Sequence, residues 1–228
     1  MPRLYPIAAA LFLSACYPWS PPALGPVTQP APPATGQIAA PVYAVAAAPT
    51  EARAPVTILV SIDGFRPDYL DRGVTPELAR LAAGGVRGAV RPSFPSKTAP
   101  NHWTLVTGLR PDRNGIVSNN FVDPRRPKET FTMAADDPFW WNEGEPVWVT
   151  AEKAGIRTAA MYWPGSNVAV GGVRAEAWPN ATTGGVRPSA WQGYYMALPQ
   201  ANRVDAIIDW LRRPAAVRPR FLTLYFDT

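Results

Sequence analysis

Residues 56–228 contain short apolar runs that alternate with amphipathic stretches. The run over 56–62 is continuous and rich in β-branched side chains, which is typical of a strand buried on both faces of a parallel sheet. Similar runs over 158–162 and 221–226 predict two more strands. Each of these runs is too short to span a membrane as a helix, which needs about 18 or more apolar residues.

The stretches between these runs have the features of helices. One helix is predicted over 204–211, where apolar side chains recur at i, i+3, i+4 and i+7 (Val204, Ile207, Ile208 and Leu211). A second helix is predicted over 76–83, because this stretch begins with Pro and ends before a Gly-Gly pair. Two more are predicted, one from about Ala99 and one over 146–154. Strands that alternate with helices predict an α/β domain with a mostly parallel sheet, whose chemistry gathers at the carboxyl ends of the strands.

The first 55 residues differ in composition from the rest. Arg3 precedes an apolar run from Ile7 to Leu13, and Leu13-Ser14-Ala15-Cys16 follows, which ends in the single cysteine of the chain. This resembles a bacterial lipoprotein signal, so we expect residues 1–15 to be a signal peptide and Cys16 to be lipidated. Residues 16–55 are rich in Pro and Ala, which predicts a disordered tether. The expected location is the bacterial envelope, at the outer membrane or in the periplasm.

Composition excludes several classes of site. One Cys and one His rule out a disulfide framework, a cysteine-rich zinc module and a zinc site built on three histidines. The net charge of +5 is modest, and the basic residues are scattered without interleaved aromatics. We therefore expect no nucleic-acid-binding surface. The sequence gives no indication of oligomeric state.

Two segments contain residues suited to catalysis. Asp63 follows the first predicted strand, where its carboxylate can reach a cation. An Asp-Gly hairpin turn is the alternative, but the residues after Gly64 do not alternate like a returning strand. Thr98 stands at the expected N-cap of the helix near Ala99, facing the positive end of the helix dipole. Asn101 lies on the same helix face, where its amide could donate to a phosphoryl oxygen.

Several segments, in order, resemble the nucleotide pyrophosphatase/phosphodiesterase family of the alkaline phosphatase superfamily. The matching segments are Ser61-Ile62-Asp63-Gly64-Phe65, Pro92-Ser93-Phe94-Pro95, Thr98-Ala99-Pro100-Asn101-His102, Leu105-Val106-Thr107-Gly108-Leu109-Arg110-Pro111, Asn114-Gly115-Ile116-Val117, Trp163-Pro164-Gly165-Ser166 and Leu224-Tyr225-Phe226. The resemblance implies a three-layer α/β/α sandwich over residues 56–228. It also implies that Asp63 is a zinc ligand, that Thr98 is both a zinc ligand and the nucleophile, and that Asn101 binds the phosphoryl oxygen. The sulfatase branch is disfavoured because Thr98 and His102 occupy the positions of its modified nucleophile and its Arg.

The chain departs from the family pattern in two places. Ala99 replaces an aromatic residue that forms one wall of the nucleobase slot in the family, while Tyr194 could match the other stacking aromatic. The remaining family ligands for two Zn²⁺ ions, an Asp and several His, would follow Asp227. We therefore expect a domain that is incomplete at its C-terminus, with at most a partial metal site and no activity in the 228-residue chain.

Three further residue groups have ordinary structural interpretations. His102 is expected to be a hydrogen-bonded structural histidine. Asp136-Asp137 is expected in a solvated loop, and Trp191 in the core.

The function expected from these observations is metal-dependent hydrolysis of a phosphodiester or pyrophosphate, with a nucleotide-like small molecule as substrate. A phosphomonoesterase or phosphonate hydrolase of the same superfamily is an alternative. Another is a non-catalytic envelope lipoprotein that retains the half-domain for binding. That last alternative needs the sheet edge after Phe226 to be covered, because an open edge invites aggregation.

Overall fold

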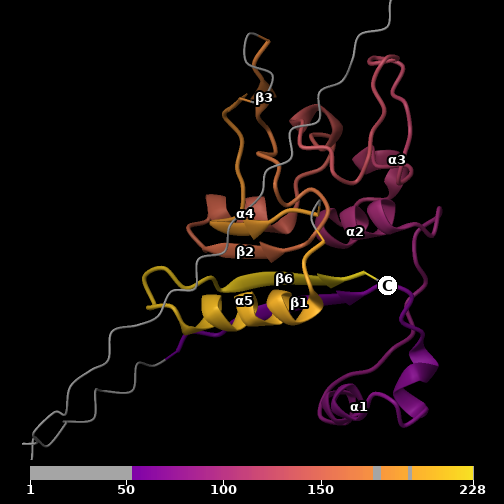
Figure 1. The fold of residues 1–228 in the computed structure, drawn as a ribbon, viewed down its shortest axis with the longest axis vertical. Coiled ribbons are helices and arrows are strands. Elements are labelled where there is room, and N and C mark those ends of the chain that lie inside the picture. The colour runs from indigo at the N-terminus through magenta and orange to yellow at the C-terminus, as the bar shows by residue number, and fades with distance from the viewer. Residues whose placement is uncertain (1–52, 177–180, 195–196, 228) are drawn as a thin grey trace, which may run out of the picture. The chain divides into compact units, whose positions relative to one another are not determined.

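The fold is built on a parallel sheet that joins distant parts of the chain (Figure 1). The computed structural model describes residues 53–176, 181–194 and 197–227, so the predicted signal peptide, Cys16 and nearly all of the tether lie outside it. The sheet has the strand order β1-β6-β2-β5, and each neighbouring pair is parallel. Its strands are β1 (Thr57–Ile62), β6 (Phe221–Phe226), β2 (Thr158–Met161) and β5 (Ala190–Gln192). The prediction of an α/β domain with a parallel sheet is confirmed.

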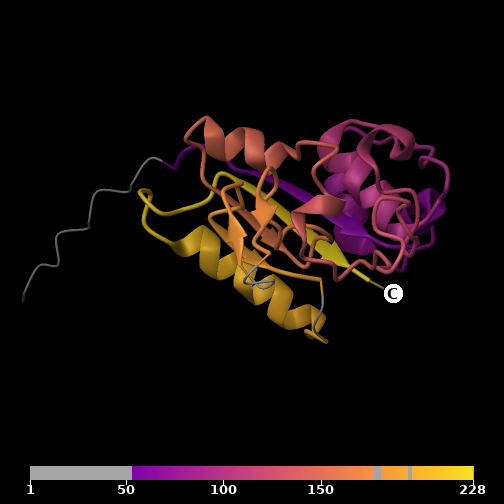
Figure 2. The same cartoon turned by 90° about the horizontal axis from the view of Figure 1, so that it is seen from above.

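Helices lie on both faces of this sheet. Figure 2 shows α4 (Val147–Lys153) on one face and α5 (Gln200–Arg212) on the other. The remaining helices are α1 (Pro76–Ala83), α2 (Thr98–Thr107), α3 (Pro111–Asn114) and the 3₁₀ helices η1 (Pro67–Asp71) and η2 (Pro138–Trp140). A small hairpin, β3 (Val173–Arg174) and β4 (Thr182–Thr183), stands apart from the sheet. In the part of the chain described here, no helix is both long enough and apolar enough to cross a bilayer.

The strand order corrects two predictions about the sheet. β6 lies between β1 and β2, so the strand that ends at Phe226 is internal and the open edges are β1 and β5. β1 is not buried on both faces, because it pairs only with β6, and Ile58 and Val60 remain 41% and 49% exposed. The reason is topological: the chain skips one position between β1 and β2, and β6 later fills it.

The amphipathic helix α5 was predicted correctly, but its buried face was not. Its buried residues are Arg203, Ile207 and Trp210, whereas Val204 and Ile208 are each 38% exposed. Arg203 donates through Nη1 to the carbonyl oxygen of Tyr225 at 3.0 Å and to Asp227 Oδ1 at 2.7 Å. A guanidinium that is hydrogen-bonded and paired in this way can be buried. The prediction of the buried helix face was wrong because it used the hydrophobic positions alone.

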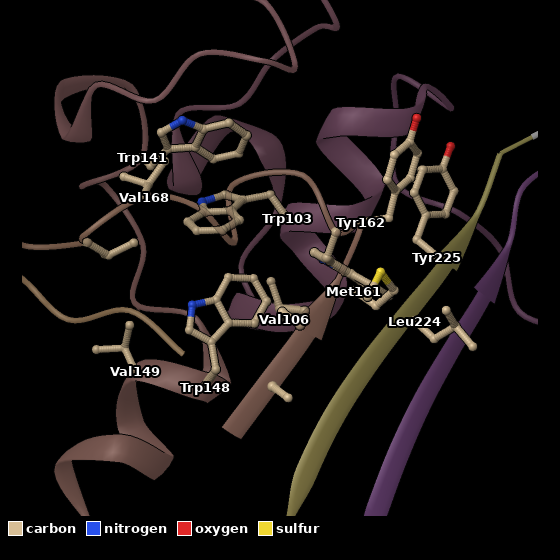
Figure 3. Close-up of a cluster of buried hydrophobic side chains, with 14 of the residues drawn as sticks. Trp103, Val106, Trp141, Trp148, Val149, Met161, Tyr162, Val168, Leu224 and Tyr225 are labelled. Atoms are coloured by element: carbon tan, nitrogen blue, oxygen red, sulfur yellow. The ribbon is translucent and has the colours of Figure 1, made fainter. Parts of the chain in front are cut away.

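The largest buried side chains form a tryptophan core between the sheet, α2 and α4 (Figure 3). It consists of Trp103, Trp141, Trp148 and Trp163, each 0% exposed. Gly165 has φ +81°, and a Cβ there would lie 2.8 Å from the ring of Trp141 and 2.9 Å from that of Trp103. Only glycine fits this position, which gives the Trp163-Pro164-Gly165-Ser166 motif a packing reason.

Two structural interpretations of single residues are wrong. Trp191 is not in the core: it lies on the edge strand β5 and is 41% exposed. Asp137 is not solvated but 6% exposed, because its carboxylate accepts from the Phe139 N–H and pairs with Arg126 at 2.6 Å. Its neighbour Asp136 is exposed, as expected.

Candidate functional site

Asp63 and Thr98 meet at the carboxyl end of β1. Thr98 Oγ1 donates a hydrogen bond to Asp63 Oδ2 at 3.1 Å, across a separation of 35 residues. The sheet holds Asp63 in place, since its N–H donates to the carbonyl of Phe226 on β6 at 2.9 Å. A cavity of about 500 Å³ opens beside the pair and is lined partly by Phe65, Lys97 and Leu105.

Thr98 is the first residue of α2 rather than its N-cap. The N-cap is Lys97, whose backbone is extended, and whose carbonyl accepts from the Asn101 N–H at 3.2 Å. The predicted boundary was therefore one residue off. The consequence is chemical, because the Thr98 hydroxyl is not used for capping and points to Asp63 instead.

His102 contacts the backbone of Thr98 and the side chain of Ser61. Its interpretation as a hydrogen-bonded structural histidine is confirmed. It is 4% exposed, its Nδ1 lies 2.8 Å from the Thr98 carbonyl and its Nε2 lies 3.0 Å from Ser61 Oγ. A carbonyl can only accept, so Nδ1 carries the proton and Ser61 donates to Nε2. Burial lowers the pKa of His102 below its usual value, against the opposing hydrogen bond to Thr98.

Tyr225 on β6 is a contact of Asp63 that sequence reasoning missed. Its hydroxyl donates to Asp63 Oδ2 at 2.9 Å, and its ring packs against His102 with the centroids 4.2 Å apart. Burial, together with the hydrogen bond to Asp63, raises the pKa of Tyr225 well above its usual value, so the phenol keeps its proton. The parallel pairing of β1 with β6 sets Tyr225 opposite Ser61, and the sequence predicted both strands but not that they are neighbours. We refer to Asp63, Thr98, His102 and Tyr225 as the carboxyl-end site.

Asn101 lines the same cavity as Asp63 and Thr98, but its amide bonds to the backbone of the loop before α2. Its Nδ2 lies within hydrogen-bonding distance of the carbonyls of Ser93 at 3.3 Å, Pro95 at 3.1 Å and Lys97 at 2.9 Å. Its Oδ1 accepts from the Ser93 N–H at 2.8 Å. Both ends of the amide are thus engaged with the backbone of the loop before α2, and Asn101 fixes that loop.

Asn119 supplies the side-chain amide that does lie at the start of α2. Its Oδ1 accepts from the Ala99 N–H at 2.8 Å, and the neighbouring Ser118 accepts from Lys97 Nζ at 3.2 Å. Within the described residues no hydrogen bond engages Asn119 Nδ2, which leaves its two protons free for a ligand beside Thr98. Only the fold brings this amide to Thr98, so nothing in its local sequence would have selected it.

The two residues discussed for nucleobase binding differ in accessibility. Ala99 is 0% exposed and part of the hydrophobic core. Tyr194 is half-buried, and its ring centroid lies 4.8 Å from that of Tyr162 and 5.7 Å from that of Tyr225. Burial, followed by the nearby charge of Asp227, raises the pKa of Tyr194. The ring of Tyr194 therefore neighbours that of Tyr225, which bonds to Asp63. Ala99, by contrast, offers no surface to a ligand.

The donor set suits a cation but does not complete a zinc site. Asp63 and Thr98 present two oxygen atoms to one point, and a catalytic zinc takes at least three protein ligands. Over residues 53–176, 181–194 and 197–227 no group of three or more His, Cys, Asp or Glu could hold a metal ion.

The chain is similar to known proteins over most of its described length. The model of the family described as "Type I phosphodiesterase / nucleotide pyrophosphatase" matches residues 57–228. An uncharacterised pyrophosphatase/phosphodiesterase of Schizosaccharomyces pombe is 42% identical over 172 residues, which are 74% of this chain and 33% of that protein. Ectonucleotide pyrophosphatase/phosphodiesterase family member 1 of Rattus norvegicus is 35% identical over 184 residues, covering 78% of this chain and 19% of that protein.

Solved structures show the same fold. Murine ectonucleotide pyrophosphatase/phosphodiesterase 5 aligns with a TM-score of 0.64 and 32% identity over 75% of this chain and 43% of that chain. An inactive threonine-to-alanine variant of it, in complex with AMP, aligns with a TM-score of 0.65 and 31% identity over 76% of this chain and 43% of that chain. The chain thus spans less than half the length of each of these relatives.

Proposed function

The chain belongs to the type I phosphodiesterase / nucleotide pyrophosphatase family, and on that premise we propose that its protein hydrolyses phosphodiester or pyrophosphate bonds with Thr98 as the nucleophile. The observation that supports this most is the contact between Thr98 Oγ1 and Asp63 Oδ2 at 3.1 Å. Further support comes from the murine relative, whose threonine-to-alanine variant is inactive.

In the proposed reaction, Thr98 Oγ1 attacks the phosphorus atom and the leaving group departs with its oxygen. The hydroxyl proton of Thr98 is lost to solvent and the departing oxygen takes a proton from water. The threonine-bound phosphoryl group keeps the other ester substituent of the substrate. Water then attacks the phosphorus atom from the opposite side, which releases a phosphomonoester and returns a proton to Thr98 Oγ1. Asn119 Nδ2 donates to a non-bridging oxygen, in the role that the sequence suggested for Asn101. His102 holds the Thr98 carbonyl and thereby the first turn of α2.

We propose two zinc ions as the metal of the complete domain. Asp63 and Thr98 would hold one of them, with further ligands that family resemblance assigns downstream of Asp227. Bound there, the metal would lower the pKa of the Thr98 hydroxyl and so favour its ionised, nucleophilic form near neutral pH. The adjacent carboxylate and hydroxyl oxygens support this assignment as part of a ligand set.

The proposed substrate is a phosphodiester that need not be a nucleotide. The AMP complex of the murine relative favours a nucleotide-like ligand. Ala99 argues for weak base binding here, because one missing stacking face costs about 1–3 kcal/mol. If Tyr194 provides the other face, Tyr194→Ala raises KM for a dinucleotide about tenfold and leaves KM for an aryl phosphodiester unchanged.

The decisive experiment compares Thr98→Ala with wild type in protein expressed from the complete gene. With bis(p-nitrophenyl) phosphate as substrate, we expect kcat to fall by about three orders of magnitude or more, since the nucleophile is lost. Acid quenching of the wild-type reaction and mass spectrometry should find a p-nitrophenyl phosphoryl group on Thr98, because one aryl ester leaves in the first step and the other stays. Thr130→Ala, on an exposed threonine, is the matched control and should keep wild-type kcat.

Equal hydrolysis by Thr98→Ala and wild type would show that the mechanism is wrong. Faster hydrolysis of p-nitrophenyl phosphate than of the diester would instead support a phosphomonoesterase. A wild-type protein that hydrolyses neither ester would favour the binding lipoprotein.

We also propose that the protein is exported and anchored in the bacterial envelope through a lipid on Cys16. The apolar run before this single cysteine supports the proposal. Wild-type protein should incorporate labelled palmitate and fractionate with membranes, whereas Cys16→Ala should do neither. Unlabelled, freely soluble wild-type protein would contradict it.

A further inference from the structure

Tyr225 has no part in the chemistry proposed above, yet it hydrogen-bonds to Asp63, the proposed metal ligand. Its hydroxyl and Thr98 Oγ1 both donate to Asp63 Oδ2, while the Gly64 N–H donates to Asp63 Oδ1 at 3.0 Å. When Thr98 binds a metal or attacks a substrate, its bond to Asp63 is given up. The hydroxyl of Tyr225 and the Gly64 N–H then remain as the donors that orient the carboxylate.

We infer that Tyr225 is a positioning residue that sets the orientation of the Asp63 carboxylate for metal binding, and that His102 fixes the Tyr225 ring. The inference rests on the proposed function, because it assumes that Asp63 is a ligand. Groups that hydrogen-bond to a ligand fix its orientation, and their removal commonly costs 10–100-fold in metal affinity or activity.

The backbone determines the reach of the Tyr225 hydroxyl. β1 and β6 pair in parallel over their whole length, with Ser61 opposite Tyr225 and Ile62 opposite Phe226. Arg203 of α5 also donates a hydrogen bond to the Tyr225 carbonyl at 3.0 Å. Because both strands are fixed in register, the distance from the Tyr225 hydroxyl to Asp63 varies little.

The ring of Tyr225 is held from more than one side. Its centroid lies 4.2 Å from that of His102 and 5.7 Å from that of Tyr194, and it is 1% exposed. Figure 3 shows the rings of Tyr225 and Tyr162 side by side, and their centroids are 6.2 Å apart. A ring packed in this way holds its hydroxyl in one direction.

His102 connects this ring to the nucleophile. The same imidazole packs on Tyr225, donates to the Thr98 carbonyl and accepts from Ser61. It therefore sets the first turn of α2 relative to Tyr225, and with it the distance between Thr98 and Asp63.

The test is Tyr225→Phe in protein expressed from the complete gene, with Tyr162→Phe as the matched control. Both changes remove one phenol hydroxyl from the same buried cluster, and in the described residues only that of Tyr225 bonds to Asp63. Zinc affinity, measured by competition with a chelator, should fall 10–100-fold in Tyr225→Phe and by less than about twofold in Tyr162→Phe. At low free zinc kcat should fall by about tenfold with KM nearly unchanged, and excess zinc should restore much of it.

Three results would overturn the inference. Wild-type zinc affinity in Tyr225→Phe would remove the positioning role while the proposed function stood. Equal losses in Tyr225→Phe and Tyr162→Phe would assign the effect to packing. A wild-type protein that binds no zinc and hydrolyses no diester would remove the proposed function, and this inference with it.

The unfolding temperature of the metal-free protein would show whether Tyr225→Phe misfolds. A second variant keeps the inference testable in that case. Ser61→Ala frees His102 Nε2 without touching Tyr225, so zinc affinity should fall by less than in Tyr225→Phe but measurably. Unchanged affinity in Ser61→Ala would overturn the role of His102.

Discussion

Helix α2 joins two regions that are held together in different ways. Its inner face contributes Trp103 to the tryptophan core, where the four indoles are fully enclosed and Trp103 meets Trp141 and Trp148 edge to face, with centroids 4.8 and 5.8 Å apart. Its first turn contributes Thr98 to the carboxyl-end site, where contacts are directed hydrogen bonds such as those to Asp63.

The comparison teaches that one helix can serve stability and chemistry through separate residues. Packing in the tryptophan core depends on shape, so a change of volume there should cost stability. The carboxyl-end site depends on which donor meets which acceptor, so a change there should cost activity more than stability. The two regions touch where Trp163 packs edge to face on His102, with centroids 4.8 Å apart. Substitutions within each region test how far they act separately, and one outside both shows a smaller effect.

The largest effect is expected from Gly165→Ala in the tryptophan core. The new Cβ would overlap the rings of Trp141 and Trp103 and would impose a left-handed backbone on alanine. Overpacking and backbone strain together should lower the free energy of unfolding by about 4 kcal/mol. Urea denaturation measures this.

The control is Gly171→Ala, at φ +83° with nothing within 4 Å of the new Cβ, which should cost only the backbone term of about 1 kcal/mol. Similar losses in the two variants would show that the core tolerates extra volume. A fall in kcat per folded molecule in Gly165→Ala would show that the regions are coupled.

The second effect distinguishes Asn119 from Asn101. Asn119→Ala removes the amide beside Thr98 and should lower kcat for an aryl phosphodiester by about 100-fold, with little change in unfolding temperature. Asn101→Ala removes the bonds that fix the loop before α2 and should lower the free energy of unfolding by about 1–2 kcal/mol. If Asn101→Ala instead lowered kcat and Asn119→Ala lowered the free energy of unfolding, Asn101 would be the residue that acts on the substrate, which would contradict the geometry.

The smallest effect concerns pH, outside both regions. Burial alone would raise the pKa of Asp137, but the Phe139 N–H and the Arg126 guanidinium more than offset it, so the pKa lies below its ordinary value of 3.8. A depressed pKa in the folded state adds stability above that value, and this stability is lost as the pH falls through the folded pKa. Urea midpoints measured between pH 6 and pH 3 should therefore fall less in Asp137→Asn than in wild type. Parallel curves would contradict this.

Much of the fold was predictable from local patterns. The strands over 158–161 and 221–226 and the helices after Pro76 and Pro146 follow from apolar runs, Pro and Gly positions, which act within a few residues. His102 could be assigned as structural for a similar reason, since its Nδ1 bonds to a carbonyl four residues earlier on the same helix.

The candidate site was only half predictable. Asp63 and Thr98 were found because motif resemblance names them, and they do meet. Asn101 was assigned on helical spacing and on the same resemblance, but spacing says only which face of the helix a residue occupies and not where its amide points. Its amide turned to the backbone of the preceding loop, where three carbonyls lie within reach.

What the sequence by itself determined is therefore the main strands and helices, the family and the pair of Asp63 and Thr98, to which we assign the roles of carboxylate ligand and nucleophile as a proposal. Only the tertiary structure decided that β6 enters between β1 and β2, that Arg203 is buried, and that Tyr225 and Asn119 reach the site. The physical reason is range. Propensity and periodicity act between near neighbours, whereas a hydrogen bond between Tyr225 and Asp63 joins residues 162 positions apart and exists only once the parallel strands are in register.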